Sequence, residues 1–310
     1  MESKDYYVLS EDDKKIRCSL RGKFKKQFNL KKDKLHTLDV AAVGDFVKIN
    51  LNPDGTGAIY EIEERKNHLS RKAIKMKGAS YRGERFEQII ASNIDNLFIV
   101  SSILKPAFNN KVIDRIIVAG ESSHLNTFII INKIDIDENR EALEWKNFYS
   151  GIGYNVFLTS AKKVEGIQIL KEELKGKTNL FWGPSGVGKS SILNELFPEL
   201  ELETGDVSES SHKGKHTTVT SILNKVDENT FVIDTPGIRE IDPYGIRKED
   251  LGHYFLDFSP HFLNCRFNTC THYHEPGCAV LKAVEEGIIS EVRYESYLNI
   301  LETIEDDMNF

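Results

Sequence analysis

The clearest chemistry in this chain lies in a glycine-rich segment that ends in lysine and serine. Residues 183–190 read GPSGVGKS, between an apolar stretch and a helix-forming stretch. Backbone N–H groups of such a loop close around phosphate oxygens, and the following helix N-terminus adds its dipole. Lys189 is then suited to the β- and γ-phosphates, and the Ser190 hydroxyl to Mg²⁺. We expect a nucleotide phosphate loop comprising Gly183, Pro184, Ser185, Gly186, Val187, Gly188, Lys189, Ser190 and Ser191.

A second signature begins with an acid: Asp234-Thr235-Pro236-Gly237 follows the apolar stretch 231–233. An acid at the carboxyl end of a strand can orient water on Mg²⁺. The backbone N–H of Gly237 can meet a γ-phosphate. Opposite a phosphate loop, this signature predicts the switch II segment of a nucleotide hydrolase.

Two further signatures indicate guanine as the base. Asp135, in Asn132-Lys133-Ile134-Asp135, can accept hydrogen bonds from N1–H and N2–H₂ of guanine, a pair that adenine lacks. We expect Lys133 to lie along the base and Asn132 to tie the loops together. The third segment, Ser160, Ala161 and Lys162, would support the guanine O6 through backbone N–H groups.

The order of these signatures is unusual. The guanine signatures come first, the phosphate loop follows, and Asp234–Gly237 comes last. In an ordinary GTPase the phosphate loop leads. The sequence therefore predicts a circularly permuted GTPase, in which the chain passes from Gly237 into a cysteine-rich module within about 30 residues.

Residues 205–221 are rich in Ser, Gly, Lys and Thr, and we expect a switch I loop there. Thr217 or Thr218 would bind Mg²⁺ and the γ-phosphate; residue chemistry does not separate the two. Ile238 occupies the position where Ras-like enzymes carry a water-orienting Gln. His216 is the nearest substitute, and a solvent-exposed loop histidine is the equal alternative.

Three of the four cysteines lie close together near the C-terminus. Cys265, Cys270, His272 and Cys278 form a Cys₃His set suited to tetrahedral Zn²⁺. Four protein ligands leave no position for a catalytic water, so we expect one structural zinc per chain. His261 and His274 compete for the histidine position.

The N-terminal region carries a concentrated positive charge, although the chain as a whole has a net charge of −7. Ten basic residues and one acid lie between Lys14 and Lys34. This field is typical of proteins that bind phosphate-rich partners, and a solvated surface is the alternative. Short alternating stretches within about the first 65 residues indicate a small barrel of OB or SH3 type.

The rest of the sequence predicts two more domains. Apolar strands alternate with amphipathic helices after Asn96, which indicates a parallel sheet covered on both faces. We expect a barrel over 1–70, a GTPase domain over 71–243 and a helical zinc-binding domain over 244–310, and residues 70–90 are typical of a polar linker. A polar N-terminus and the lack of a long apolar run predict a cytoplasmic protein that does not enter membranes.

The chain resembles the bacterial RsgA family, also called YjeQ or YloQ. The nucleotide signatures carry this resemblance, together with Ala91–Asp95, Ile113-Asp114-Arg115 and the run CRFNTCTHYHEPGCAV from Cys265 to Val280. The resemblance implies an OB-fold, a circularly permuted GTPase domain and a zinc-binding domain. It also implies late maturation of the 30S ribosomal subunit and GTP hydrolysis stimulated by that subunit.

The resemblance also bears on individual residues. It favours His272 over His274 as a zinc ligand and places the family's suggested catalytic histidine on His216. The partners it implies are the 30S subunit with its 16S rRNA, and GTP or GDP; we expect a monomer. Two other functions stay open: an RNA-binding protein in which hydrolysis is incidental, and a metabolic P-loop ATPase or kinase, against which Asp135 argues.

Overall fold

The protein is described from a computed structural model of the 310-residue chain. The structure describes residues 5–22, 40–73, 87–204, 221–235 and 242–304. The chain divides into two compact units, residues 1–93 and residues 94–310. Each unit is described by itself.

The first unit contains a four-stranded sheet. It consists of β1 (Tyr6–Leu9), β2 (Lys15–Leu20), β3 (Val47–Leu51) and β4 (Gly57–Ile62), in the spatial order β1-β2-β4-β3. β2 and β4 run parallel, and the other pairs are antiparallel. Side chains on the covered face surround Cys18, Leu20 and Ile59. Cys18 therefore fills a small apolar core.

A second ladder in the first unit corrects the expectation of a linker at 70–90. β5 (His68–Lys72) pairs with β6 (Glu87–Ser92) in antiparallel register. Behind it, Arg65 donates two hydrogen bonds to the buried carboxylate of Asp45. The Ser92 hydroxyl donates to the same carboxylate at 2.6 Å. The ends of the presumed linker are thus parts of the first unit.

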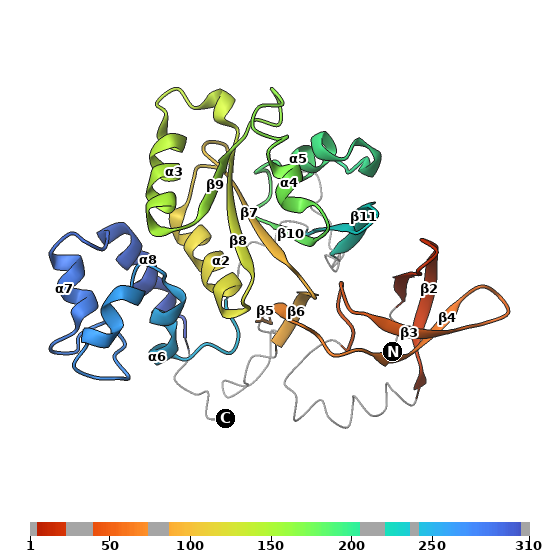
Figure 1. Ribbon diagram of the computed structural model, residues 1–310, viewed down its shortest axis with the longest axis horizontal. Helices are drawn as coiled ribbons and strands as arrows, with labels where there is room; N and C mark the ends of the chain where they lie inside the picture. The colour runs from red at the N-terminus through yellow and green to blue at the C-terminus, as the bar shows by residue number, and fades with distance from the viewer. Residues whose placement is uncertain (1–4, 23–39, 74–86, 205–220, 236–241, 305–310) are drawn as a thin grey trace, which may run out of the picture. The chain divides into compact units, whose positions relative to one another are not determined.

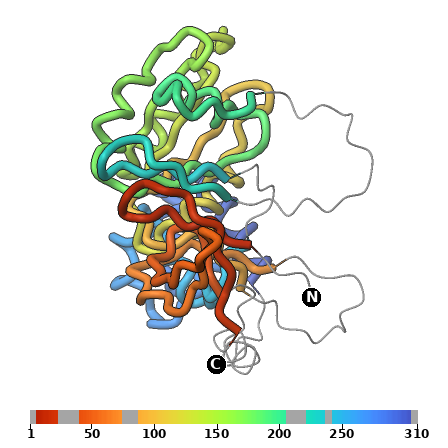
Figure 2. The backbone as a smooth tube through the Cα atoms, turned by 90° about the vertical axis from the view of Figure 1, so that its right-hand side faces the viewer, coloured from red at the N-terminus to blue at the C-terminus, as the bar shows by residue number. Residues whose placement is uncertain are grey.

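The second unit is built on a six-stranded sheet. Its strands lie in the order β11-β12-β10-β7-β8-β9, and only the edge pair β11–β12 is antiparallel. β11 and β12 lie side by side in cyan in Figure 2. The strands are β7 (Asn96–Ser102), β8 (Asn126–Asn132), β9 (Asn155–Leu158), β10 (Thr178–Trp182), β11 (Ile222–Asp227) and β12 (Thr230–Asp234).

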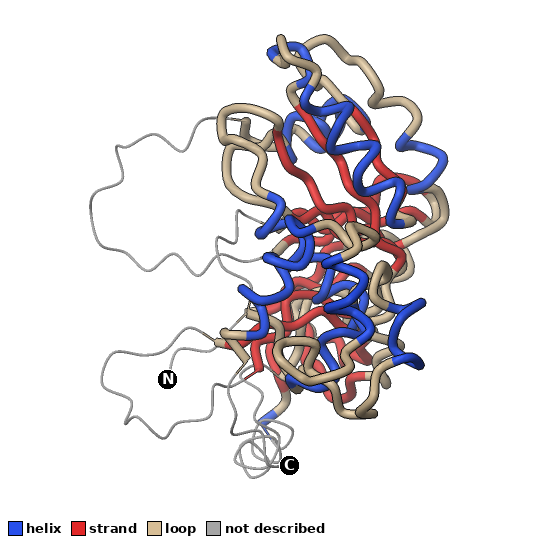
Figure 3. The backbone as a smooth tube through the Cα atoms, turned by 90° about the vertical axis from the view of Figure 1, so that its left-hand side faces the viewer, coloured by secondary structure: helices blue, strands red, loops and turns tan. Residues whose placement is uncertain are grey.

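Helices cover both faces of this sheet (Figures 1 and 3). α4 (Leu170–Leu174) and α5 (Lys189–Leu196) pack on Phe98, Phe128 and Phe181, whose rings stack in a row across three strands. α2 (Asn110–Ser122) and α3 (Glu141–Ile152) lie on the other face. Because side chains alternate along a strand, fully apolar strands supply a core to both layers.

A helical module completes the second unit after the last strand. It contains α6 (Lys248–Leu251), α7 (Ala279–Glu285) and α8 (Glu291–Leu301), with short 3₁₀ turns at Gly252–Tyr254 and Ser259–Asn264. Phe255, Phe258 and Tyr297 form its core, and Val118 of α2 belongs to the same apolar cluster. The remaining 3₁₀ turns of the described chain are Ile134–Ile136 and Pro198–Leu200.

Among the described residues, no helix combines the length and the apolar character needed to cross a membrane.

Candidate nucleotide site and metal centre

The predicted nucleotide signatures meet at one edge of the large sheet. Asn132 ends β8, Ser160 follows β9, Gly183 follows β10 and Asp234 ends β12. These strands are parallel, so their carboxyl ends lie along the same edge. Ligands of open parallel sheets bind at this edge. The permuted chain order therefore leaves the signatures together in space.

Asn132 ties three loops together. Its amide nitrogen donates to the Val187 carbonyl in the phosphate loop at 2.9 Å. Its side-chain oxygen accepts hydrogen bonds from the Thr159 hydroxyl and the Ala161 amide, at 3.1 and 3.2 Å. Gly188 makes room for this contact, because a Cβ there would lie 2.3 Å from Nδ2 of Asn132. The expected tie between loops is thus present.

Lys133 reaches across the same gap. Its ammonium donates to the Gly186 carbonyl at 2.6 Å and to the Lys105 carbonyl. Sequence reasoning did not anticipate the loop around Lys105, which follows β7. Apart from Pro106, nothing in that stretch signals a role at the site.

The residues predicted to recognise guanine are also brought together. The Ser160 hydroxyl donates to Oδ1 of Asp135 and accepts from the Lys163 amide at 3.2 Å. Ser160 is fully buried, whereas Asp135 is half-buried and Lys162 is exposed. The Ser160 hydroxyl contacts only one of the two carboxylate oxygens of Asp135.

The predicted phosphate loop, residues 183–191, follows β10 and leads into α5. Gly183 is required because a Cβ would lie 2.0 Å from the Val100 carbonyl oxygen. The Lys189 ammonium donates to the Gly183 and Pro184 carbonyls at 2.9 and 3.1 Å, which folds the side chain over its own loop. Burial lowers the pKa of Lys189, while the charge of Asp234 opposes that shift.

Asp234 lies beside Ser190 of the predicted phosphate loop. Burial raises the pKa of the Asp234 carboxyl, against the effects of the Lys189 charge and a hydrogen bond from Ser190. Oδ1 of Asp234 is buried and has no hydrogen-bond partner among the described residues. A buried carboxylate oxygen beside a serine hydroxyl is an oxygen-donor set that fits Mg²⁺.

Several predicted site residues lie outside the described part of the chain. They are His216, Thr217, Thr218 and Gly237, together with Ile238.

The Cys₃His set forms a compact cluster in the helical module. The ligand atoms of Cys265, Cys270, His272 and Cys278 all lie within 4.8 Å of one another. Nδ1 of His272 faces the sulfurs, 3.4 Å from Cys278 and 3.7 Å from Cys265. Neither His261 nor His274 belongs to the group. Burial raises the pKa of the Cys270 and Cys278 thiols, and a bound cation would favour their thiolates instead.

Outer groups hold this cluster in place. The Glu275 carboxylate accepts from the Thr271 hydroxyl and from the amides of Thr271, Tyr273 and His274. Despite partial burial, these hydrogen bonds hold the pKa of Glu275 at about 2. The Tyr294 and Tyr297 hydroxyls donate to the carbonyls of His272 and Thr271. Such outer contacts fix the orientation of metal ligands.

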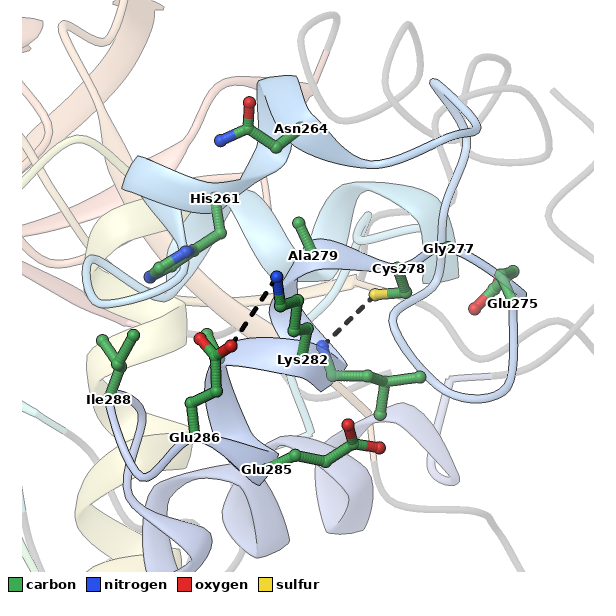
Figure 4. Close-up of a pocket in the computed structure, with 12 residues that line it drawn as sticks. His261, Asn264, Glu275, Gly277, Cys278, Ala279, Lys282, Glu285, Glu286 and Ile288 are labelled. Atoms are coloured by element: carbon green, nitrogen blue, oxygen red, sulfur yellow. Dashed lines mark hydrogen bonds and ion pairs between the residues drawn. The ribbon is translucent and has the colours of Figure 1, made fainter.

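The surface beside the cluster is hollowed by a pocket of about 640 Å³ (Figure 4). The backbone amide of Leu281 donates to the Cys278 sulfur at 3.4 Å, and Lys282 pairs with Glu286 at 3.6 Å. The first contact stabilises a thiolate at the start of α7. The second is an exposed ion pair of small energetic weight.

Comparison with known proteins decides the family. The family model described as RsgA GTPase matches residues 62–244. The chain belongs to the RsgA GTPase family. Similar members include the small ribosomal subunit biogenesis GTPase RsgA 2 of Bacteroides thetaiotaomicron, 38% identical over 97% of this chain and 94% of that protein. RsgA of Bacillus pumilus is also 38% identical, with the same coverage.

Two solved structures extend the RsgA likeness to the fold. YjeQ from Thermotoga maritima is 36% identical, with a TM-score of 0.71 over 96% of this chain and 93% of that chain. YloQ, a circularly permuted GTPase, is 30% identical, with a TM-score of 0.66 over 96% and 90%. They confirm the predicted fold class: an N-terminal OB-type barrel, a permuted α/β GTPase domain and a helical domain that carries the Cys₃His group.

Proposed function

We propose that this protein hydrolyses GTP to GDP and phosphate and acts in late maturation of the small ribosomal subunit. The convergence of the four signatures at one sheet edge carries the proposal, in particular the Asn132 hydrogen bonds to the phosphate loop and to Ala161. Membership of the RsgA family and the printed names of its relatives support the biological role.

Each site residue has a proposed task. Asp135 accepts from guanine, Lys133 lies along the base, and Ser160, Ala161 and Lys162 support the O6 side. The loop Gly183–Ser191 holds the phosphates, with Lys189 moving from its carbonyl contacts to the β- and γ-phosphates. Ser190, Asp234 and either Thr217 or Thr218 would hold Mg²⁺, which neutralises developing phosphate charge when bound. Gly237 would contact the γ-phosphate.

The metal of the Cys₃His centre is proposed to be one structural zinc ion. Thiolates and an imidazole form a soft donor set that suits Zn²⁺, and four protein ligands fill a tetrahedral site. Metal analysis of purified protein should find about one zinc per chain. Cys278→Ser should lower that content, whereas Cys18→Ser, at a buried cysteine of the first unit, should not.

The proposed partner is the 30S subunit, contacted through its 16S rRNA. The basic N-terminal region suits a phosphate backbone. Because such a partner is a ribosomal particle, we propose that the protein acts in the cytoplasm. We also propose that it is a monomer.

GTP turnover measured with and without purified 30S subunits tests the proposal. We expect 30S to raise kcat. Turnover that 30S leaves unchanged would favour an RNA-binding protein in which hydrolysis is incidental. A competition assay in which ATP displaces GTP would favour a metabolic ATPase or kinase.

A further inference from the structure

Helix α2 joins the GTPase sheet to the helical module that carries the metal cluster (Figure 1). One side of the helix packs so closely on the sheet that a Cβ on Gly120 would lie 2.8 Å from Leu97. On the other side, Val118 belongs to the apolar core of the helical module. Two consecutive residues of α2, Asp114 and Arg115, make polar contacts to the helical module and to Asp242.

Asp114 fixes the helical module. Its carboxylate pairs with the Arg293 guanidinium of α8, and both side chains are almost completely inaccessible. Tyr149 of α3 donates to the same carboxylate at 2.9 Å, and Asp257 lies 3.3 Å from Arg293. Removing one member of such a pair would leave an uncompensated buried charge. α2, α3 and α8 are therefore joined into one block by buried polar contacts.

Arg115 contacts a different part of the chain. Its guanidinium donates to Oδ1 of Asp242 at 2.8 Å, to the Thr303 hydroxyl at 3.1 Å and to the Asn299 carbonyl at 3.2 Å. The planar fork of arginine suits such a three-way contact. The side chains of Arg115 and Asp242 are only partly covered, with exposed fractions of 20% and 29%.

Asp242 is the first described residue after Thr235. The Thr235 hydroxyl donates to the Phe181 carbonyl at 2.9 Å, which ties it to β10, the strand before the phosphate loop. The chain on one side of residues 236–241 is thus held by the phosphate-loop strand. On the other side it is held by Arg115, on the block that carries the helical module.

We propose that Arg115 is a positioning residue for partner-stimulated GTP hydrolysis. The Arg115–Asp242 ion pair connects the chain that follows the Asp234 signature to the helical module. A partner that contacts this module therefore acts on the nucleotide site. The inference rests on the proposed function, since it assumes stimulation by 30S. Coupling between two sites has to run through a connection whose arrangement both can bias.

Charge reversal tests the ion pair. Arg115→Glu, Asp242→Arg and the double variant are compared with wild type for basal GTP turnover, GTP affinity and stimulation by purified 30S. Each single variant should lose at least about fivefold in stimulation, with basal turnover and GTP affinity unchanged. The double variant should recover most of the loss. Asp242→Asn, which is nearly isosteric, should reproduce the single loss without a reversed charge.

Lys111→Glu is the matched control. Lys111 also joins α2 to α8, but through an exposed ion pair with Glu295 at 3.6 Å. The control should keep wild-type stimulation. Single variants that 30S stimulates like wild type, a double variant that recovers nothing, or an equal loss in Lys111→Glu would each overturn the inference. A wild-type protein that 30S does not stimulate would overturn the proposed function, and the inference with it.

Discussion

The Ser160 hydroxyl donates a hydrogen bond of 2.7 Å to Oδ1 of Asp135. The two residues follow neighbouring strands, β9 and β8, and are 25 positions apart in the chain. The carboxylate is therefore oriented before a base arrives, and less ordering is left for the binding step.

Asp135→Asn should change the preferred base. The amide donates where the carboxylate accepted, so it fits the C2 carbonyl of xanthine better than the amino group of guanine. Losing the hydrogen bond to the amino group of guanine, and the charge assistance of the one to N1–H, should weaken GTP binding by about 100-fold or more. Titration with fluorescent guanine and xanthine nucleotides measures the change in base preference. Ser160→Ala should weaken GTP binding by less, and unchanged base preference in Asp135→Asn would remove Asp135 from base recognition.

Glu275→Ala should loosen the metal centre although Glu275 is not a ligand. The change leaves the Thr271, Tyr273 and His274 amides without their acceptor. An unsatisfied donor costs about 1–3 kcal/mol, so we expect a lower Tm and faster zinc release to a chelator. Glu285, exposed on α7, supplies the control substitution Glu285→Ala. Equal zinc release rates in the two variants would contradict the role of Glu275.

Asp45 should make the stability of the first unit depend on acid. Burial alone would raise the pKa of Asp45, but hydrogen bonds from Arg65, Ser92 and the Ala42 amide lower it overall. Stability from this group is therefore full above the unfolded pKa of about 3.9 and is lost as pH falls through the lower folded value. Hydrogen exchange of β3–β6 should show faster opening in Asp45→Asn at pH 7, with the difference shrinking below about pH 4.

The control for that measurement is Asp12→Asn, because Asp12 is exposed. Tryptophan fluorescence is the wrong probe, since both tryptophans, Trp145 and Trp182, lie in the second unit. A constant difference between wild type and Asp45→Asn from pH 7 to pH 3 would exclude the proposed linkage.

His216→Ala should lower kcat and leave GTP affinity nearly unchanged. With Ile238 in place of a Gln, another group has to orient the attacking water, and we propose His216 of the predicted switch I segment for that task. Single-turnover hydrolysis of prebound GTP isolates the chemical step. A kcat equal to that of wild type would exclude His216 from the mechanism.

The strands and their signatures could be predicted because each apolar run is short and ends at a polar group with defined chemistry. Asn155–Leu158, for example, is a short strand that Ser160 follows closely. The Cys₃His set was also predictable, because four soft ligands lie within 14 residues. Residue chemistry leaves three histidines open, the family resemblance favours His272 over His274, and in the fold His272 places a ring nitrogen against the sulfurs.

Other features depend on contacts between distant residues. β11 alternates weakly and carries Lys225 and Asp227, so its pairing with β12 is visible only in the sheet. Ile113-Asp114-Arg115 belongs to the family resemblance, but the ion-pair partners of Asp114 and Arg115, Arg293 and Asp242, lie more than 120 positions away. Ser92 and Asn93 likewise gain their roles from Asp45 and Gly44. No local pattern encodes such pairings.

The sheet order also determines what a nascent chain can complete. β7, β8 and β9 are consecutive in sequence and adjacent in space, so the base-recognition half can assemble as soon as Ser160 has emerged. The other edge of β7 stays unpaired until Thr178–Trp182 has been synthesised, because that segment forms its neighbouring strand β10. An unpaired strand edge can pair with other chains. The sheet order therefore places the predicted base-recognition signatures on one side of β7 and the strand that leads into the phosphate loop on the other.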